Sequence, residues 1–257
     1  MPATSVDSSG RDEVVPAAQA EAERSRQRPV SLLQRLQKRY PVVSIVRAAK
    51  VSRWLSGRRG QSAPEGRPVK TYEYDDRYFR KQHCAVSQTA IKLVVLHSTE
   101  GPTAEGGAIT LSGSSDVSAH LCVGEGVTYR IVPEWLGSCT VQEPNDWTLN
   151  IEQVGFAAWS RKKWLRHLNT IKRAAFWTAW WCKKHKLPRR FRNTKALDAG
   201  KIRGYTTHAQ LSLSKWSSST HTDPGPNYPL FGKVSFRALL LYYRGRIAAG
   251  LKPRQAA

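Results

Sequence analysis

The stretch IKLVVLH at residues 91–97 decides the fold, because it is an apolar run that ends in a histidine. Valine and leucine dominate it, which predicts a central β-strand. Two later segments end in a similar way: GYTTH at 204–208 closes on a second histidine, and HTDPGPNYP at 221–229 carries an aspartate. We expect each of these three side chains to lie where a strand or a rigid loop ends.

The set of His97, His208 and Asp223 indicates a metal site. Either histidine alone is more typical of a core or surface position, so the prediction depends on all three. Imidazole nitrogen and carboxylate oxygen both bind zinc, and three such ligands with a free fourth position are typical of catalytic zinc. Structural zinc is usually held by four ligands, often cysteines. Glu152, in the strand-like segment NDWTLNIEQVGF (145–156), adds a base beside the metal.

Five ordered segments extend this pattern: VVLHSTEG (94–101), SAHLCVGEGVTYRIVPE (118–134), NIEQ (150–153), TTH (206–208) and HTDPGP (221–226). Together they resemble the zinc-dependent N-acetylmuramoyl-L-alanine amidases, the family shared by phage lysins, bacterial cell-wall amidases and peptidoglycan recognition proteins. The resemblance covers about residues 90 to 245. It implies an α/β fold with a central mixed β-sheet flanked by helices. It also implies hydrolysis of the amide bond between N-acetylmuramic acid and L-alanine in peptidoglycan.

The resemblance also assigns roles to single residues. It implies that His97, His208 and Asp223 bind Zn²⁺ with water at the fourth position, and that Glu152 is the general base and then the acid toward the leaving amine. Two residues before the third ligand the family often has a lysine, but this chain has His221. We predict that His221 stabilises the oxyanion. The alternative is that it replaces or supplements a metal ligand.

Two other residues have roles that the sequence leaves open. His120 follows Ala119, where some phage members have a tyrosine, and it either forms a hydrogen bond near the cleft or packs in the hairpin. Glu100 either orients His97 through its other ring nitrogen or is a solvated loop charge.

The chain divides into a segment at 1–28 that we expect to be disordered, a basic extension and linker at 29–70, and a catalytic domain at 71–257. The extension has eight Lys and Arg and no acidic residue between 29 and 60, with Pro41 expected to divide it into two short helices. It either docks on an anionic membrane surface or wall polymer, or packs on the domain or remains solvated.

Within the domain, periodicity predicts the remaining elements. They are a hairpin over 118–132, strands over 148–154 and 204–208, a long helix over 161–186 and a closing helix over 234–249. Trp164 and Trp181 of the long helix are expected in the core rather than as platforms for sugar rings.

The formal charge of +22 is concentrated in residues 161–257, which carry 22 Lys and Arg against 2 Asp and Glu. Such a surface attracts anionic polymers by Coulomb forces. Dedicated nucleic-acid binding is not expected, because the sequence has no zinc finger, RNA-recognition signature or basic leucine zipper. A cell wall rich in phosphate or carboxylate is the preferred partner. The sequence does not indicate the oligomeric state.

The four cysteines, Cys84, Cys122, Cys139 and Cys182, lack CxxC spacing and are expected to be free, buried thiols. Residues 1–28 lack the apolar core of a signal peptide. We therefore expect synthesis in the cytoplasm and another route to the wall, as phage endolysins have. The alternative function is a non-catalytic peptidoglycan-binding module of the same fold, against which the retained ligands and Glu152 argue.

Overall fold

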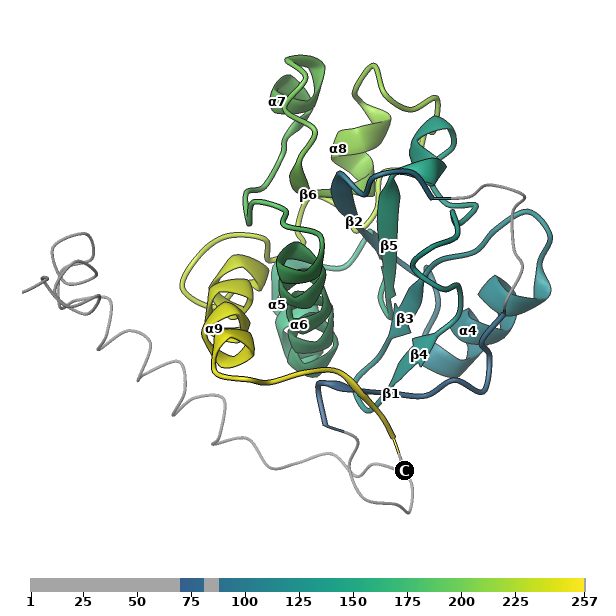
Figure 1. Cartoon of the computed structure of the whole chain (residues 1–257), viewed down its shortest axis with the longest axis vertical. Helices are drawn as coiled ribbons and strands as arrows, with labels where there is room; N and C mark the ends of the chain where they lie inside the picture. The colour runs from purple at the N-terminus through teal and green to yellow at the C-terminus, as the bar shows by residue number, and fades with distance from the viewer. Residues whose placement is uncertain (1–69, 81–87, 257) are drawn as a thin grey trace, which may run out of the picture. The chain divides into compact units, whose positions relative to one another are not determined.

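A computed structural model describes residues 70–80 and 88–256 (Figure 1). The predicted segments at 1–28 and 29–69, with their helices and Pro41, lie outside the described residues, as does Cys84. Within the described part of the chain, no helix is both long enough and apolar enough to cross a membrane.

A five-stranded mixed sheet forms the centre of the domain (Figure 1). Its strands are β2 (Leu93–Ser98), β3 (Leu121–Val123), β4 (Thr128–Arg130), β5 (Thr148–Gln153) and β6 (Gly204–Thr207), in the order β4-β3-β5-β2-β6. All neighbours pair in parallel except β3 and β4, which are antiparallel. Every residue of β2 is buried, as expected for a central strand covered on both faces. A second, two-stranded sheet pairs β1 (Glu73–Tyr74) with β7 (Arg254–Gln255).

Helices cover both faces of this sheet, which confirms the predicted fold class. The helix α6 (Leu168–Lys184) packs on β2 and β5, with α9 (Phe236–Ala248) against it (Figure 1). The short helix α8 (His208–Ser212) contacts β2, and α7 (Thr194–Asp198) lies beside α8.

The alternation of side chains along β2 decides which face carries His97. Leu93 and Val95 pack with Leu211 of α8 in one apolar cluster. Because successive strand residues point to opposite faces, His97 lies on this same face. The sheet register pairs His97 with Glu152 of β5, so the acid points to the α8 face too.

The predicted long helix is interrupted. It consists of α5 (Arg161–Arg166), whose first turn is capped by the Ser160 side chain, and α6, separated at His167 by non-helical torsion angles. Trp164 and Trp181 are fully buried, which confirms their predicted place in the core.

Several helices were not predicted. One of them, α4 (Ala104–Gly113), packs on β3 and β4 although it contains three glycines. A Cβ at Gly107 would lie 3.0 Å from the Cys122 sulfur, so the glycine allows the helix to approach the sheet closely. The others are α7, α8 and the 3₁₀ helix η1 (Glu143–Asp146). His208 therefore begins a helix directly after β6 instead of ending the strand.

Among the described residues, the prediction of free thiols is wrong for Cys139. Cys122 and Cys182 are free and buried, as expected. Cys139, however, is disulfide-bonded. Sequence spacing does not show which thiols the fold brings together, because pairing depends on tertiary geometry.

The loop that carries Asp223 requires a glycine. Gly225 has φ +82°, and a Cβ there would lie 1.9 Å from the carbonyl oxygen of Ala157. A side chain at this position would therefore push the loop away from its neighbour. The backbone carbonyl of Asp223 accepts a hydrogen bond from the Ala209 amide at 2.9 Å, which ties the loop to α8.

Candidate metal centre

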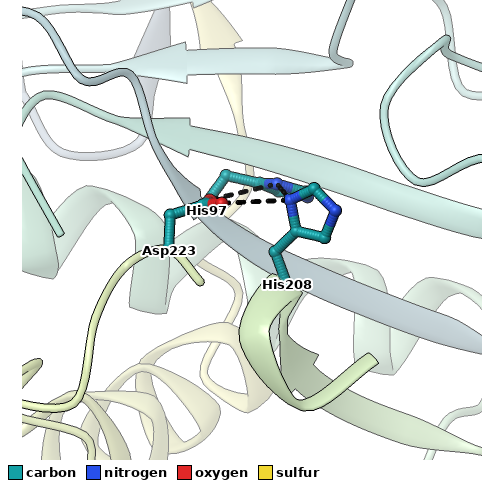
Figure 2. Close-up of side chains that lie close together, drawn as sticks. All are labelled: His97, His208 and Asp223. Carbon is teal, nitrogen blue, oxygen red and sulfur yellow. Dashed lines mark hydrogen bonds and ion pairs between the residues drawn. The ribbon is translucent and has the colours of Figure 1, made fainter. Parts of the chain in front are cut away.

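Three buried side chains from distant parts of the sequence converge on the α8 face of the sheet (Figure 2). His97 comes from the end of β2, His208 from the first turn of α8, and Asp223 from the loop before α9. The Nδ1 atoms of the two histidines are 3.0 Å apart. The carboxylate of Asp223 approaches His208 Nδ1 at 3.1 Å and His97 Nδ1 at 3.4 Å.

These separations fit one metal ion. Two ligand atoms of a tetrahedral zinc site lie about 3.3 Å apart, because each bond is about 2.0–2.1 Å long. Two imidazole nitrogens that face each other at 3.0 Å also need a proton or a metal ion between them, since their lone pairs repel. The donor set, two imidazoles and one carboxylate, suits zinc. The structure thus brings together all three predicted ligands.

The atoms that face away from this centre also have partners. His97 Nε2 is 3.0 Å from Asn150 Oδ1, and His208 Nε2 is 2.8 Å from Ser219 Oγ. The Ser98 amide donates to Asp223 Oδ2 at 3.1 Å. Such contacts orient metal ligands and leave their other atoms free to bind.

Sequence reasoning missed Asn150 and Ser219. A signal for Asn150 existed, because it lies two residues before Glu152 in a strand and therefore on the same face. Its amide is buried and must find hydrogen-bond partners there. No comparable signal marks Ser219, whose contact depends on the course of the loop after α8.

The charges of the three groups influence one another strongly. Burial alone would raise the pKa of Asp223, but hydrogen bonds from His208 and His97 hold it far below its usual value. Burial lowers the pKa of His208 to about 4, and repulsion by His97 adds to this effect. Burial also opposes the charge of His97, but Glu152 and Asp223 outweigh it and raise the pKa of His97. Asp223 is therefore an anion that a cation would stabilise.

Glu152 lies beside the centre, and its carboxyl group is suited to proton transfer. Its Oε1 is 3.8 Å from His97 Nδ1, and its buried Oε2 accepts no hydrogen bond from any described residue. Burial raises the pKa of Glu152 to about 7, with a further contribution from Asp223. A carboxyl group with this pKa both accepts and donates protons near neutral pH.

His221 lies at the open side of the centre. Its side chain is 69% exposed, and its Nδ1 is 3.6 Å from Asp223 Oδ1. Its ring leans on the ring of His208, with centroids 4.8 Å apart. Beside it is a cavity of about 290 Å³ between α8 and the loop 219–222. His221 is thus outside the group of three converging side chains and lines this cavity.

The structure places the two residues with open roles away from the metal ligands. Glu100 does not occupy the second nitrogen of His97. It accepts hydrogen bonds from the Ser98 hydroxyl and the Ala157 amide, both at 2.7 Å, and so joins two loops. His120 is fully buried, and its Nδ1 accepts a hydrogen bond from the Asn150 amide at 3.0 Å. It therefore supports the strand behind the site.

Comparison with known protein families gives a match over most of the domain. Residues 87–226 match the model of the N-acetylmuramoyl-L-alanine amidase family, a range that includes all three converging ligands, Glu152 and His221. Among curated proteins, none matches this chain.

Several solved structures are similar to this chain. The crystal structure of the Staphylococcus aureus hydrolase AmiA in complex with its ligand is similar with a TM-score of 0.52 and 16% identity, covering 74% of this chain and 90% of AmiA. The catalytic domain of PlyG has a TM-score of 0.43 at 14% identity, covering 57% and 83%. The amidase LysC from Clostridium intestinale URNW has a TM-score of 0.39 at 14% identity, covering 62% and 86%.

The raised pKa of Glu152 predicts a pH-dependent effect of Glu152→Gln on metal-free protein. Because the folded-state pKa exceeds the unfolded value of about 4.3, wild-type protein loses stability as pH rises from there through about 7. The glutamine cannot ionise. We expect the variant to be more stable than wild type at pH 8, on the order of 1–3 kcal/mol, and equally stable near pH 4.

Urea unfolding of chelator-treated protein at both pH values measures this difference. Glu105→Gln is the control, because the Glu105 side chain is 55% exposed. If the free energy of unfolding of Glu152→Gln differed from that of wild type by the same amount at pH 8 and pH 4, the site would not disfavour the ionised form of Glu152.

Proposed function

We propose that this chain, which belongs to the N-acetylmuramoyl-L-alanine amidase family, is a zinc-dependent hydrolase of peptidoglycan. The bond cut is the amide between the lactyl group of N-acetylmuramic acid and L-alanine. The observation that carries the proposal is the convergence of His97, His208 and Asp223 with Glu152 beside them.

In this proposal His97, His208 and Asp223 hold the ion. Bound zinc would lower the pKa of a water ligand from about 15.7 toward about 7 and polarise the scissile carbonyl. Glu152 takes the proton of the attacking water through its free Oε2 and later gives a proton to the leaving amine of L-alanine. His221, exposed at the mouth of the site, donates a hydrogen bond to the carbonyl oxygen as negative charge develops on it.

We further propose that the enzyme acts as a phage endolysin. It would be made in the cytoplasm and reach the wall once the membrane is breached. The basic extension at 29–70 remains a predicted contact to a membrane surface or wall polymer. These placements are supported by the retained site residues and by the positive charge of the chain.

Digestion of purified peptidoglycan tests the enzymatic proposal. We expect equal amounts of free lactyl groups on muramic acid and of peptides that begin with L-alanine. The products should disappear with a chelator, return with zinc, and be absent with Asp223→Ala. Binding without cleavage would favour the non-catalytic module, and new reducing sugar ends would contradict the amidase. Cells that express the protein in their cytoplasm should lyse only after their membrane is permeabilised; lysis of expressing cells with an intact membrane would contradict the endolysin placement.

His221→Ala tests the oxyanion role. Loss of one such donor typically costs about a hundredfold to a thousandfold in turnover, and we expect a decrease in this range with unchanged zinc content. His221→Lys keeps a donor and should retain most of the activity. A change below threefold would remove His221 from the mechanism, whereas loss of zinc from His221→Ala would make it a ligand.

The partner proposed for the positive charge is an anionic wall polymer, and one group of cations in the described residues supports this proposal. The segment 190–192 lies along β6, the last strand of the sheet, with Phe191 bridged to Tyr205. We call the surrounding cations the basic edge; they are Lys186, Arg189, Arg190, Arg192, Arg203 and Arg244. No carboxylate forms an ion pair with any of them in the described part of the chain.

The guanidinium groups of the basic edge are close enough to disfavour one another's charge. Burial lowers the pKa of Arg189, and Arg244 lowers it further; burial and Arg190 do the same to Arg192. A polymer with repeated phosphate groups would supply the negative charge that these guanidinium groups lack.

Co-sedimentation of chelator-treated protein with wall sacculi tests the basic edge. Arg190→Gln with Arg244→Gln should weaken binding at least about threefold at about 0.1 M salt, because charge attraction at that ionic strength extends over only about 10 Å. Lys162→Gln with Lys252→Gln, which removes the same charge elsewhere, should have less effect. Equal losses in both variants, unchanged binding after the polymer is stripped from the sacculi, or a preference for duplex DNA would contradict the proposal.

A further inference from the structure

We propose that Asn150 is a positioning residue that holds His97 in the one tautomer able to bind a metal ion through Nδ1. This inference rests on the proposed function, because it assumes that the centre binds a metal. Asn150 is fully buried on β5, where the sheet register places it opposite Val95. Its side-chain oxygen is 3.0 Å from Nε2 of His97. The question is which atom carries the hydrogen.

The hydroxyl of Thr148 fixes one end of the amide. Thr148 Oγ1 donates its single hydrogen to the carbonyl oxygen of Pro144 at 2.9 Å. Toward Asn150, at 3.1 Å, this hydroxyl therefore acts only as an acceptor. The Asn150 atom that faces Thr148 must be the amide nitrogen.

A second chain of hydroxyls runs in the same direction. Thr140 Oγ1 donates to the carbonyl oxygen of Ser118, so it accepts from Ser138 Oγ at 2.7 Å. The hydroxyl hydrogen of Ser138 is thereby used, and Ser138 accepts from Asn150 Nδ2 at 2.9 Å. Both hydrogens of the amide nitrogen are now assigned.

The remaining Asn150 atom is the carbonyl oxygen, which can only accept. Nε2 of His97 must therefore carry the hydrogen of that bond. A neutral imidazole has one N–H, so Nδ1 of His97 keeps a lone pair that points at His208 and Asp223. A buried carbonyl carries no net charge, so the bond fixes the tautomer without adding a second buried anion.

His208 has no equivalent constraint. Its Nε2 contacts the hydroxyl of Ser219, which can donate or accept. Without metal, His208 can place its hydrogen on Nδ1 toward His97, and with metal it can move that hydrogen to Nε2 toward Ser219. The side-chain amide of Asn150 cannot turn over to follow such a change, because its nitrogen is held by the acceptor oxygens of Ser138 and Thr148. The fixed ligand is therefore His97.

Asn150→Leu, which removes the acceptor at similar volume, tests the inference. We expect zinc affinity to fall about tenfold to a hundredfold in competition with a chromogenic chelator. Nitrogen-15 NMR of metal-free protein at pH 9 should show His97 with hydrogen on Nε2 in wild type and a mixture of tautomers in the variant. Asn150→Asp keeps an acceptor toward Nε2 and should retain the wild-type tautomer even if Asn150→Leu does not fold.

Thr148→Val is the matched control, because it removes a partner of the same buried amide but leaves the acceptor in place. It should lower stability while changing zinc affinity less than about threefold. Equal affinity in Asn150→Leu and wild type, or hydrogen on Nδ1 in metal-free wild type, would overturn the inference. Zinc binding with the expected tautomer but without cleavage of peptidoglycan would instead contradict the proposed function alone.

Discussion

The approach of two imidazole nitrogens to one buried carboxylate is the constraint on which the rest of the structure depends. Burying a carboxylate without compensation is costly, and two nitrogen lone pairs cannot face each other at 3.0 Å without a proton or a cation between them. The fold nevertheless places all three groups in its interior, at the end of β2, at the start of α8 and in the loop before α9. A metal ion bound between the three groups would offset this unfavourable free energy.

The surrounding structure makes this arrangement rigid. The central strand β2 is buried along its whole length, so His97 has little freedom to move. Gly225 allows the Asp223 loop to lie against Ala157, and the Ser98 amide directs one carboxylate oxygen. Behind these ligands, Asn150 connects His97 to two chains of hydroxyl groups. The acid Glu152 shares the same sheet face, so strand alternation places the proposed ligand His97, its proposed positioning residue and the proposed base on one side of the sheet.

The sequence predicted the parts of this account that depend on local pattern. An apolar strand ending in histidine, and the ordered segments after it, were enough to predict the sheet and the three side chains that converge with Glu152 beside them. Asn150 was missed because its role depends on which strand pairs with β2, and Cys139 because a disulfide depends on tertiary geometry. The helix α4 was missed because glycine has a low helix propensity, although Gly107 permits its close contact with Cys122. The break at His167 was not predicted, because the non-helical torsion angles there occur without a proline or glycine in the sequence.

The most direct test of the shared metal site is anomalous diffraction at the zinc edge from zinc-loaded crystals. We predict one peak bonded to Nδ1 of His97, Nδ1 of His208 and a carboxylate oxygen of Asp223, at about 2.0–2.2 Å. Nε2 of His97 should remain on Asn150. A peak bonded through Nε2 of His97, or no peak between these three side chains, would contradict this prediction.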